Sequence, residues 1–160
     1  MAYISHKDQI TDQPYIKDLG IETLSAEFNA EFLSQKLANR KAPIKQILMD
    51  NKIVVGIGNI YASESLFRAK INPKKQAKEL SDEELNAIIG AAKHVLEKAI
   101  KAGGTTLKDF VSGDNKPGYF QQKLQVYGRK GKECFVCGEK IIVLKQSGRA
   151  SFYCPNCQKE

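Results

Sequence analysis

Four cysteines stand in two closely spaced pairs near the end of the sequence, Cys134-x-x-Cys137 and Cys154-x-x-Cys157. Sixteen residues separate the pairs, a spacing typical of a zinc site with four thiolate ligands. The two residues between the cysteines of each pair let both sulfurs face one ion. A tetrahedral Zn²⁺ bound by all four thiolates has no open coordination position. The pattern predicts one structural zinc ion. The alternative, two unrelated redox pairs, lacks the strand-helix context of thioredoxin-like motifs.

Between the cysteine pairs, residues 140–146 and 150–153 are apolar and β-branched around Ser147-Gly148-Arg149. This pattern predicts a β-hairpin whose base lies at the metal site. The hairpin belongs to a zinc finger that spans 128–160 and needs zinc to fold. Basic residues outnumber acidic ones in this segment. Arg149, at the expected tip, is the side chain most exposed to a partner, and a merely solvated arginine is the alternative.

A second chemical feature is the Gly56-x-Gly58 turn, which opens a predicted helix. Free backbone N–H groups and the positive end of a helix dipole at such a turn can bind phosphate. Neither a dinucleotide fingerprint nor a Walker loop fits the flanking residues. Asn59 can add a side-chain amide to the same phosphate, with Lys45 and Lys52 supplying charge nearby, although a simple N-cap is the alternative for Asn59.

The amino-acid composition favours binding to an anionic partner. The 160 residues carry a net charge of +7 and are 42% hydrophobic, enough for one modest core and a small appendage. The first residues, MAYISHKDQITDQ, contain no apolar signal core, and no apolar run approaches the ~20 residues of a membrane span. We expect a cytoplasmic protein with no membrane partner, whose thiols stay reduced.

Helices must position these groups. Apolar residues recur at helical spacing from Ser25, a possible N-cap, to Leu37, and again in a short helix that follows Pro43 and ends at Asp50-Asn51. A further helix leads from the glycine turn towards Pro73. The longest predicted helix covers about 81–102, where Ser81 and Glu84 form a capping box and Gly103-Gly104 ends the apolar repeat.

Three regions follow from this organisation. Residues 1–23 are polar and weakly periodic and predict a loose lead-in rather than an element. Residues 24–127 form a helical domain, which includes a glycine-rich and polar surface loop at 103–119. Residues 128–160 form the finger. The fold class is therefore mainly α with a small β appendage.

Five segments resemble one known family, the formamidopyrimidine-DNA glycosylases, relatives of endonuclease VIII. They are residues 44–65 (IKQILMDNKIVVGIGNIYASES), 103–110 (GGTTLKDF), 116–120 (KPGYF), 124–130 (LQVYGRK) and the closing ASFYCPNCQK. The resemblance implies a helix–two-turn–helix (H2TH) domain followed by a β-hairpin zinc finger. Both would bind damaged duplex DNA on its minor-groove side around an extruded base, in base-excision repair of oxidised purines.

The resemblance also implies roles for individual residues. Lys45 and Asn59 would contact phosphates beside the lesion, and Arg40 would contact the DNA backbone. Arg149 would hold the lesion phosphates and assist the second elimination step. The segment from about Thr105 to Tyr119 would correspond to the loop that covers the flipped base.

The beginning of the sequence departs from the family. Its enzymes resemble one another in a Pro-Glu start, where the proline amine attacks the sugar and the glutamate handles protons, whereas Met1 is followed here by Ala2-Tyr3. We therefore expect a DNA-binding part without the nucleophile domain, inactive alone and monomeric. The alternatives are half of an active glycosylase completed in trans by a separate N-terminal chain, and a zinc-stapled adaptor that binds another protein.

Overall fold

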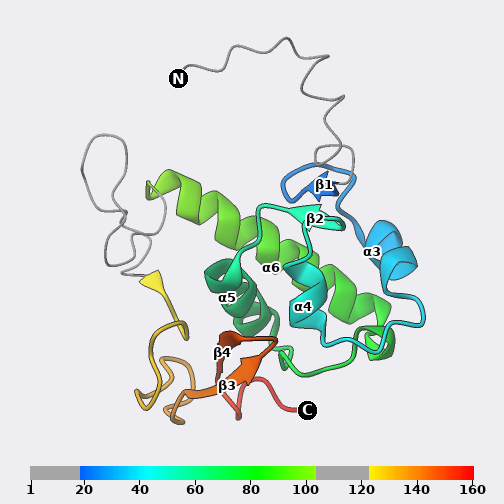
Figure 1. The fold of residues 1–160 in the computed structure, drawn as a ribbon. Coiled ribbons are helices and arrows are strands. Elements are labelled where there is room, and N and C mark those ends of the chain that lie inside the picture. The colour runs from blue at the N-terminus through cyan, green and yellow to red at the C-terminus, as the bar shows by residue number, and fades with distance from the viewer. Residues whose placement is uncertain (1–18, 104–122) are drawn as a thin grey trace.

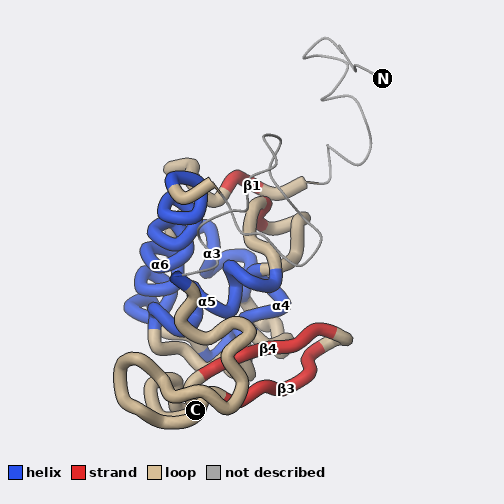
Figure 2. The backbone as a smooth tube through the Cα atoms, turned by 90° about the vertical axis from the view of Figure 1, so that its left-hand side faces the viewer, coloured by secondary structure: helices blue, strands red, loops and turns tan. Residues whose placement is uncertain are grey.

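The computed structural model describes residues 19–103 and 123–160. Residues 104–119 of the expected loop and residues 1–18 of the lead-in therefore lie outside the described residues. Within the described residues, four helices form one body, and a two-stranded hairpin lies against one end of it, below α4 and α5 in Figures 1 and 2. The mainly α class with a small β appendage is confirmed.

The body begins with a strand that the sequence did not predict. β1 (Ile21–Glu22) pairs in parallel with β2 (Val54–Val55), so the end of the lead-in is an element after all. Two residues are too few to produce a hydrophobic period. Gly20 is required by close packing rather than by a turn, because a Cβ there would lie 2.1 Å from the backbone carbonyl of Ile53.

The helices agree with the predicted periodicity, with one corrected boundary. α3 (Ala30–Leu37) is capped by Asn29, whose side chain accepts from the backbone N–H of Phe32 at 2.9 Å. Ser25 is not the cap, since its hydroxyl donates to the Glu22 carbonyl at 2.8 Å in the preceding turn. α4 (Ile44–Leu48) follows Pro43 as expected.

Two further helices make the largest helix-helix contact in the described chain. α5 (Asn59–Ala69) begins at the N-cap Gly58 and packs along α6 (Asp82–Lys101), with the 3₁₀ turn η1 (Ala77–Glu79) between them in sequence. The predicted capping box of α6 is present, since Ser81 and Glu84 each bond the other's backbone N–H. Fully buried side chains from α3, α4, α5 and α6 form the core, among them Leu33, Ile44, Leu66 and Ile88.

The hairpin consists of β3 (Ile142–Gln146) and β4 (Arg149–Tyr153), which pair antiparallel from Ile142–Tyr153 to Gln146–Arg149. Its turn is the dipeptide Ser147-Gly148, with φ values of 49° and 81°, the left-handed conformation that two-residue hairpins require. Arg149 is thus the first residue of β4 and not part of the turn. It still lies at the end of the hairpin, exposed to solvent.

Candidate nucleic-acid interface and metal centre

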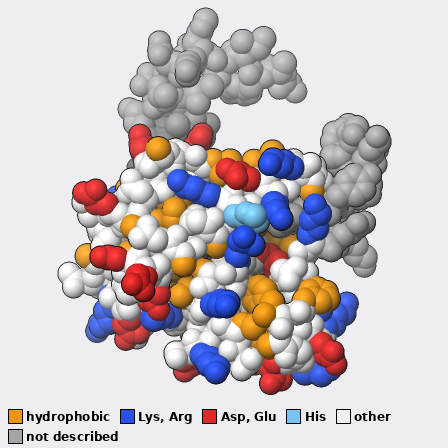
Figure 3. Space-filling model, turned by 180° about the vertical axis from the view of Figure 1, so that it is seen from behind, with side chains coloured by type: hydrophobic (Ala, Val, Ile, Leu, Met, Phe, Trp, Pro, Cys, Tyr) orange, Lys and Arg blue, Asp and Glu red, His pale blue; other side chains and the backbone are white. Residues whose placement is uncertain are grey.

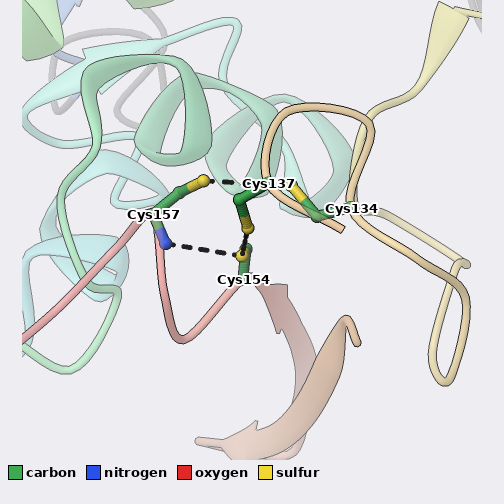
Figure 4. A group of neighbouring side chains, drawn as sticks. All are labelled: Cys134, Cys137, Cys154 and Cys157. Carbon is green, nitrogen blue, oxygen red and sulfur yellow. Dashed lines mark hydrogen bonds between the residues drawn. The ribbon is translucent and has the colours of Figure 1, made fainter. Parts of the chain in front are cut away.

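The four cysteine sulfurs come together at the base of the hairpin, as Figure 4 shows. All four Sγ atoms lie within 4.8 Å of one another, with Cys134–Cys157 at 3.9 Å and Cys137–Cys154 at 3.4 Å. Zinc–sulfur bonds of about 2.3 Å in a tetrahedron place sulfurs about 3.8 Å apart, so this donor set fits one Zn²⁺. The alternative of two unrelated redox pairs is wrong.

The metal site offers four protein ligands, and two of them pack against the helical body. Cys134 and Cys154 are buried, and they form a small core with Phe67 of α5, Val126 and Ile141. Backbone N–H groups donate to the sulfurs within each knuckle, from Val136 to Cys134 and from Cys157 to Cys154, both at 3.4 Å. Four protein ligands leave no position for substrate, so the zinc is structural.

A fully buried glutamine, which sequence reasoning missed, fixes the finger to the loop after α5. Gln158 accepts from the Cys154 N–H through its side chain and donates to the Ile71 carbonyl, both at 2.9 Å. The Asn72 side chain donates to the Gln158 carbonyl at 2.9 Å. No hydrophobic period or metal-ligand spacing marks these polar residues in the sequence.

Lys45 lies at the centre of the contact between hairpin, α4 and α5. Its side chain is 2% exposed, and its ammonium donates to Asn59 Oδ1 at 2.5 Å, Ser151 Oγ at 2.7 Å and the Ala150 carbonyl at 3.1 Å. Three acceptors match the three protons of the ammonium. Burial lowers the pKa of Lys45 from 10.5 to about 8, and the neighbouring charge of Arg149 contributes in the same direction.

Asn59 joins the same network as the first residue of α5. Its side-chain nitrogen donates to the Ala150 carbonyl at 3.1 Å, while its oxygen accepts from Lys45. Gly58 occupies the N-cap and offers no side chain, so the alternative of Asn59 as a simple N-cap is wrong. No side chain caps the start of α5, where the positive end of the helix dipole favours an anion.

A hollow of about 410 Å³ opens beside this network, between the hairpin and α4. Arg40, Lys45 and Arg149 line it together, with Asp50 as its one acidic side chain. Lys52 is not among its lining residues. The structure therefore brings Arg40, Lys45 and Arg149 to one hollow, and Asn59 is joined to it through its hydrogen bond with Lys45.

Glu64 is a second buried residue that the sequence did not reveal. It is 4% exposed, and its carboxylate accepts from the backbone N–H groups of Gln125, Val126 and Tyr127 at 2.5, 2.8 and 3.0 Å. Burial raises the pKa of Glu64 against the opposing effect of these three bonds and of Arg129. The bonds hold the segment that leads into the finger against α5.

The fold and the two sites define a class: a helix–two-turn–helix protein that carries a four-cysteine zinc finger next to a hollow lined by basic side chains. Residues 19–111 match the family described as the formamidopyrimidine-DNA glycosylase H2TH domain, and residues 131–159 match the zinc finger found in FPG and IleRS. The chain belongs to the formamidopyrimidine-DNA glycosylase family.

Individual relatives agree with this membership. The formamidopyrimidine-DNA glycosylase of Rickettsia bellii (strain OSU 85-389) is 56% identical over 159 residues, which are 99% of this chain and 58% of the relative. The crystal structure of the MutM (Fpg) protein from Thermus thermophilus matches with a TM-score of 0.86 and 38% identity, over 92% of this chain and 56% of that one.

A third relative was crystallised with DNA. The Lactococcus lactis Fpg, in complex with DNA containing an abasic site, matches with a TM-score of 0.87 and 34% identity, over 96% of this chain and 56% of that one. This chain thus spans rather more than half the length of the relatives it matches. In the described residues, no helix combines the length and the apolar character needed to cross a membrane.

Proposed function

We propose that this chain is the DNA-binding part of a formamidopyrimidine-DNA glycosylase/AP lyase for oxidised purines, acting in base-excision repair on damaged duplex DNA. One observation carries the proposal: Arg40, Lys45 and Arg149 line a single hollow, and Lys45 is hydrogen-bonded to Asn59 at the start of α5, which has no side-chain cap. The DNA-bound Lactococcus relative, similar over 96% of this chain, supports the same ligand class.

In this proposal the start of α5 accepts a phosphate of the DNA backbone. The first N–H groups of the helix point towards the ligand, and Gly58 leaves room for it to approach. The Asn59 amide nitrogen carries two hydrogens, of which one is used by the Ala150 carbonyl. The second hydrogen can donate to the same phosphate.

Lys45 acts in two ways at this site. Its buried charge lies next to the phosphate position, where a low local dielectric strengthens the attraction. By donating to Asn59 Oδ1, it also fixes which end of the amide faces outward. All three of its protons are already bonded, so direct contact with a phosphate requires exchange of one of these bonds.

Arg40 and Arg149 are exposed on the rim and free to reach further phosphates. A planar guanidinium suits two phosphate oxygens at once. The role of Arg149 in the second elimination step rests on family resemblance alone. A zinc-stapled adaptor would have little use for a buried lysine that orients an amide at a helix start, so DNA binding is the better account of this surface.

Base-release chemistry is not assigned to any residue of this chain. A separate N-terminal glycosylase chain that completes the enzyme in trans remains the second candidate. Both candidates place a monomeric chain on DNA in the bacterial cytosol or nucleoid. They differ in whether a covalent intermediate with DNA can form once the rest of the family enzyme is supplied.

The experiment has two arms. In the first, the chain is titrated against duplex DNA with and without an uncleavable abasic-site analogue at several salt concentrations; tight, salt-dependent binding that prefers the lesion supports the proposal. Binding indifferent to salt would refute it, because released counterions make phosphate contacts salt-dependent. In the second arm, borohydride trapping on 8-oxoguanine or abasic duplex tests for a working amine, with the chain alone and with an added N-terminal half.

A further inference from the structure

A second hollow, of about 530 Å³, lies at the other end of α5. The first hollow is lined by Lys45, which bonds Asn59 at the start of α5, whereas this second hollow is lined by Arg68 and Lys70 at the end of the same helix. An α-helix of 11 residues is about 16 Å long, and no residue lines both hollows. A ligand here would leave the DNA-binding surface free.

The second hollow is strongly basic. Four cations line it, Arg68, Lys70, Lys98 and Lys123, all exposed and none in an ion pair within the part of the chain that the structure describes. Its one carboxylate, Glu64, is buried and already holds three backbone N–H groups. Figure 3 shows Lys and Arg side chains gathered around a histidine on this face, which is seen from behind.

The pKa of His94 is lowered in part by the positive charges of this hollow. Burial, followed by the charges of Arg68 and Lys98, lowers its pKa below the usual 6.5. The charge of Glu97 opposes this shift, but no acidic side chain among the described residues forms an ion pair with any of the four cations of the hollow.

Apolar groups lie among these charges. Phe67 and Val95 line the hollow as buried residues, and Val136 stands in it with 64% of its side chain exposed. Val136 belongs to the first zinc knuckle, so the metal fixes its position in advance. A rigid, exposed valine loses little entropy when a ligand covers it.

We propose that this hollow is a docking site for an acidic segment of a partner protein, whose apolar side chain inserts between Phe67, Val95 and Val136 while its carboxylates meet the four cations. Charge complementarity selects the acidic partner. The apolar lining favours a peptide over nucleic acid, because bases bind by stacking on exposed aromatic faces. Phe67 is only 7% exposed, and the exposed Phe135, which has the Arg129 guanidinium 3.7 Å from its ring centre, does not line the hollow.

The test uses fluorescence anisotropy with three labelled peptides added to the whole chain. The first carries a phenylalanine flanked by aspartates, the second replaces the phenylalanine by serine, and the third replaces the aspartates by asparagines. We expect saturable binding of the first peptide and at least about tenfold weaker binding of the other two, since each loses one of the two attractions.

Matched variants locate the binding. Lys98→Glu with Lys123→Glu should weaken the first peptide about tenfold or more, whereas Lys36→Glu with Lys78→Glu, the same change in net charge on exposed residues outside the hollow, should have little effect. Val136→Ser should abolish the preference for phenylalanine over serine while zinc content stays at one per chain.

Three results would overturn the proposal. They are no saturable binding of the first peptide, an equal loss in both double variants, and displacement of the peptide by duplex DNA that persists when Arg149→Ala has weakened the DNA-binding surface. The last result would make the hollow a nucleic-acid site. None of these results depends on whether the chain prefers damaged DNA, so this proposal and the proposed function fail separately.

Discussion

The lowered pKa of Lys45 predicts that DNA binding weakens in mildly alkaline solution. With a pKa of about 8, Lys45 is about nine-tenths protonated at pH 7 and about one-tenth protonated at pH 9. A phosphate next to the ammonium stabilises the charged form and raises the pKa, so binding takes up a proton above pH 8. If only the charged form binds, affinity falls about tenfold between pH 7 and pH 9.

The opposite sign applies to folding. The pKa of Lys45 is 10.5 in the unfolded chain and about 8 in the folded one, so the unfolded chain binds the extra proton between these values. The contribution of Lys45 to stability is therefore present above pH 10.5 and lost as pH falls through 8. A decline in DNA affinity between pH 7 and 9 thus cannot be ascribed to unfolding caused by this group.

The assay is fluorescence anisotropy with a duplex that carries an uncleavable abasic-site analogue, at constant ionic strength. Lys45→Met should bind more weakly at pH 7 and show no decline towards pH 9, and exposed Lys52→Met should keep the decline of the unmodified chain. A flat profile for the unmodified chain, or an unchanged decline in Lys45→Met, would refute the reasoning.

Four further outcomes are expected. Arg149→Ala should weaken DNA binding and reduce the slope of log affinity against log salt by about 0.9, the value for one phosphate contact. Asn59→Ala should weaken binding with an unchanged circular dichroism spectrum, and loss of helical signal would contradict a role at the surface. Cys154→Ser should abolish the single zinc ion seen by metal analysis, whereas finding no zinc in the unmodified chain would contradict the site itself. Glu64→Ala removes the acceptor of three N–H groups, one buried and two partly buried, and should lower the free energy of unfolding by about 3 kcal/mol, measured by denaturant titration.

Features encoded over a few residues could be predicted from the sequence. The capping box at Ser81 and Glu84 is a local exchange of hydrogen bonds, and the zinc knuckles depend on a spacing of three along the chain. Helical periodicity located α6 to within one residue at each end. These local patterns can be recognised in the sequence because the interacting residues are close to one another along the chain.

Contacts between distant segments were not predictable from the residues alone. Glu64 meets its partners 61 to 63 positions away, and Gln158 donates to a carbonyl 87 positions away. A lone glutamate or glutamine has no period and is usually solvated, so its type does not reveal that it is buried. The same holds for β1, whose pairing with β2 spans 33 residues.

Lys45 shows how these two kinds of information combine at the functional surface. Its position near the glycine turn predicted that its positive charge lies close to a bound phosphate. Two of its three acceptors, however, are Ala150 and Ser151 of the hairpin, more than 100 residues away in the sequence. The hairpin stands on the zinc knuckles, and the finger has too little core to hold its shape without metal. We therefore expect zinc binding to hold the hairpin in the position that buries Lys45 and fixes the orientation of the Asn59 side-chain amide. It follows that Cys154→Ser should weaken DNA binding as well as unfold the finger, although no zinc ligand lines the anion site.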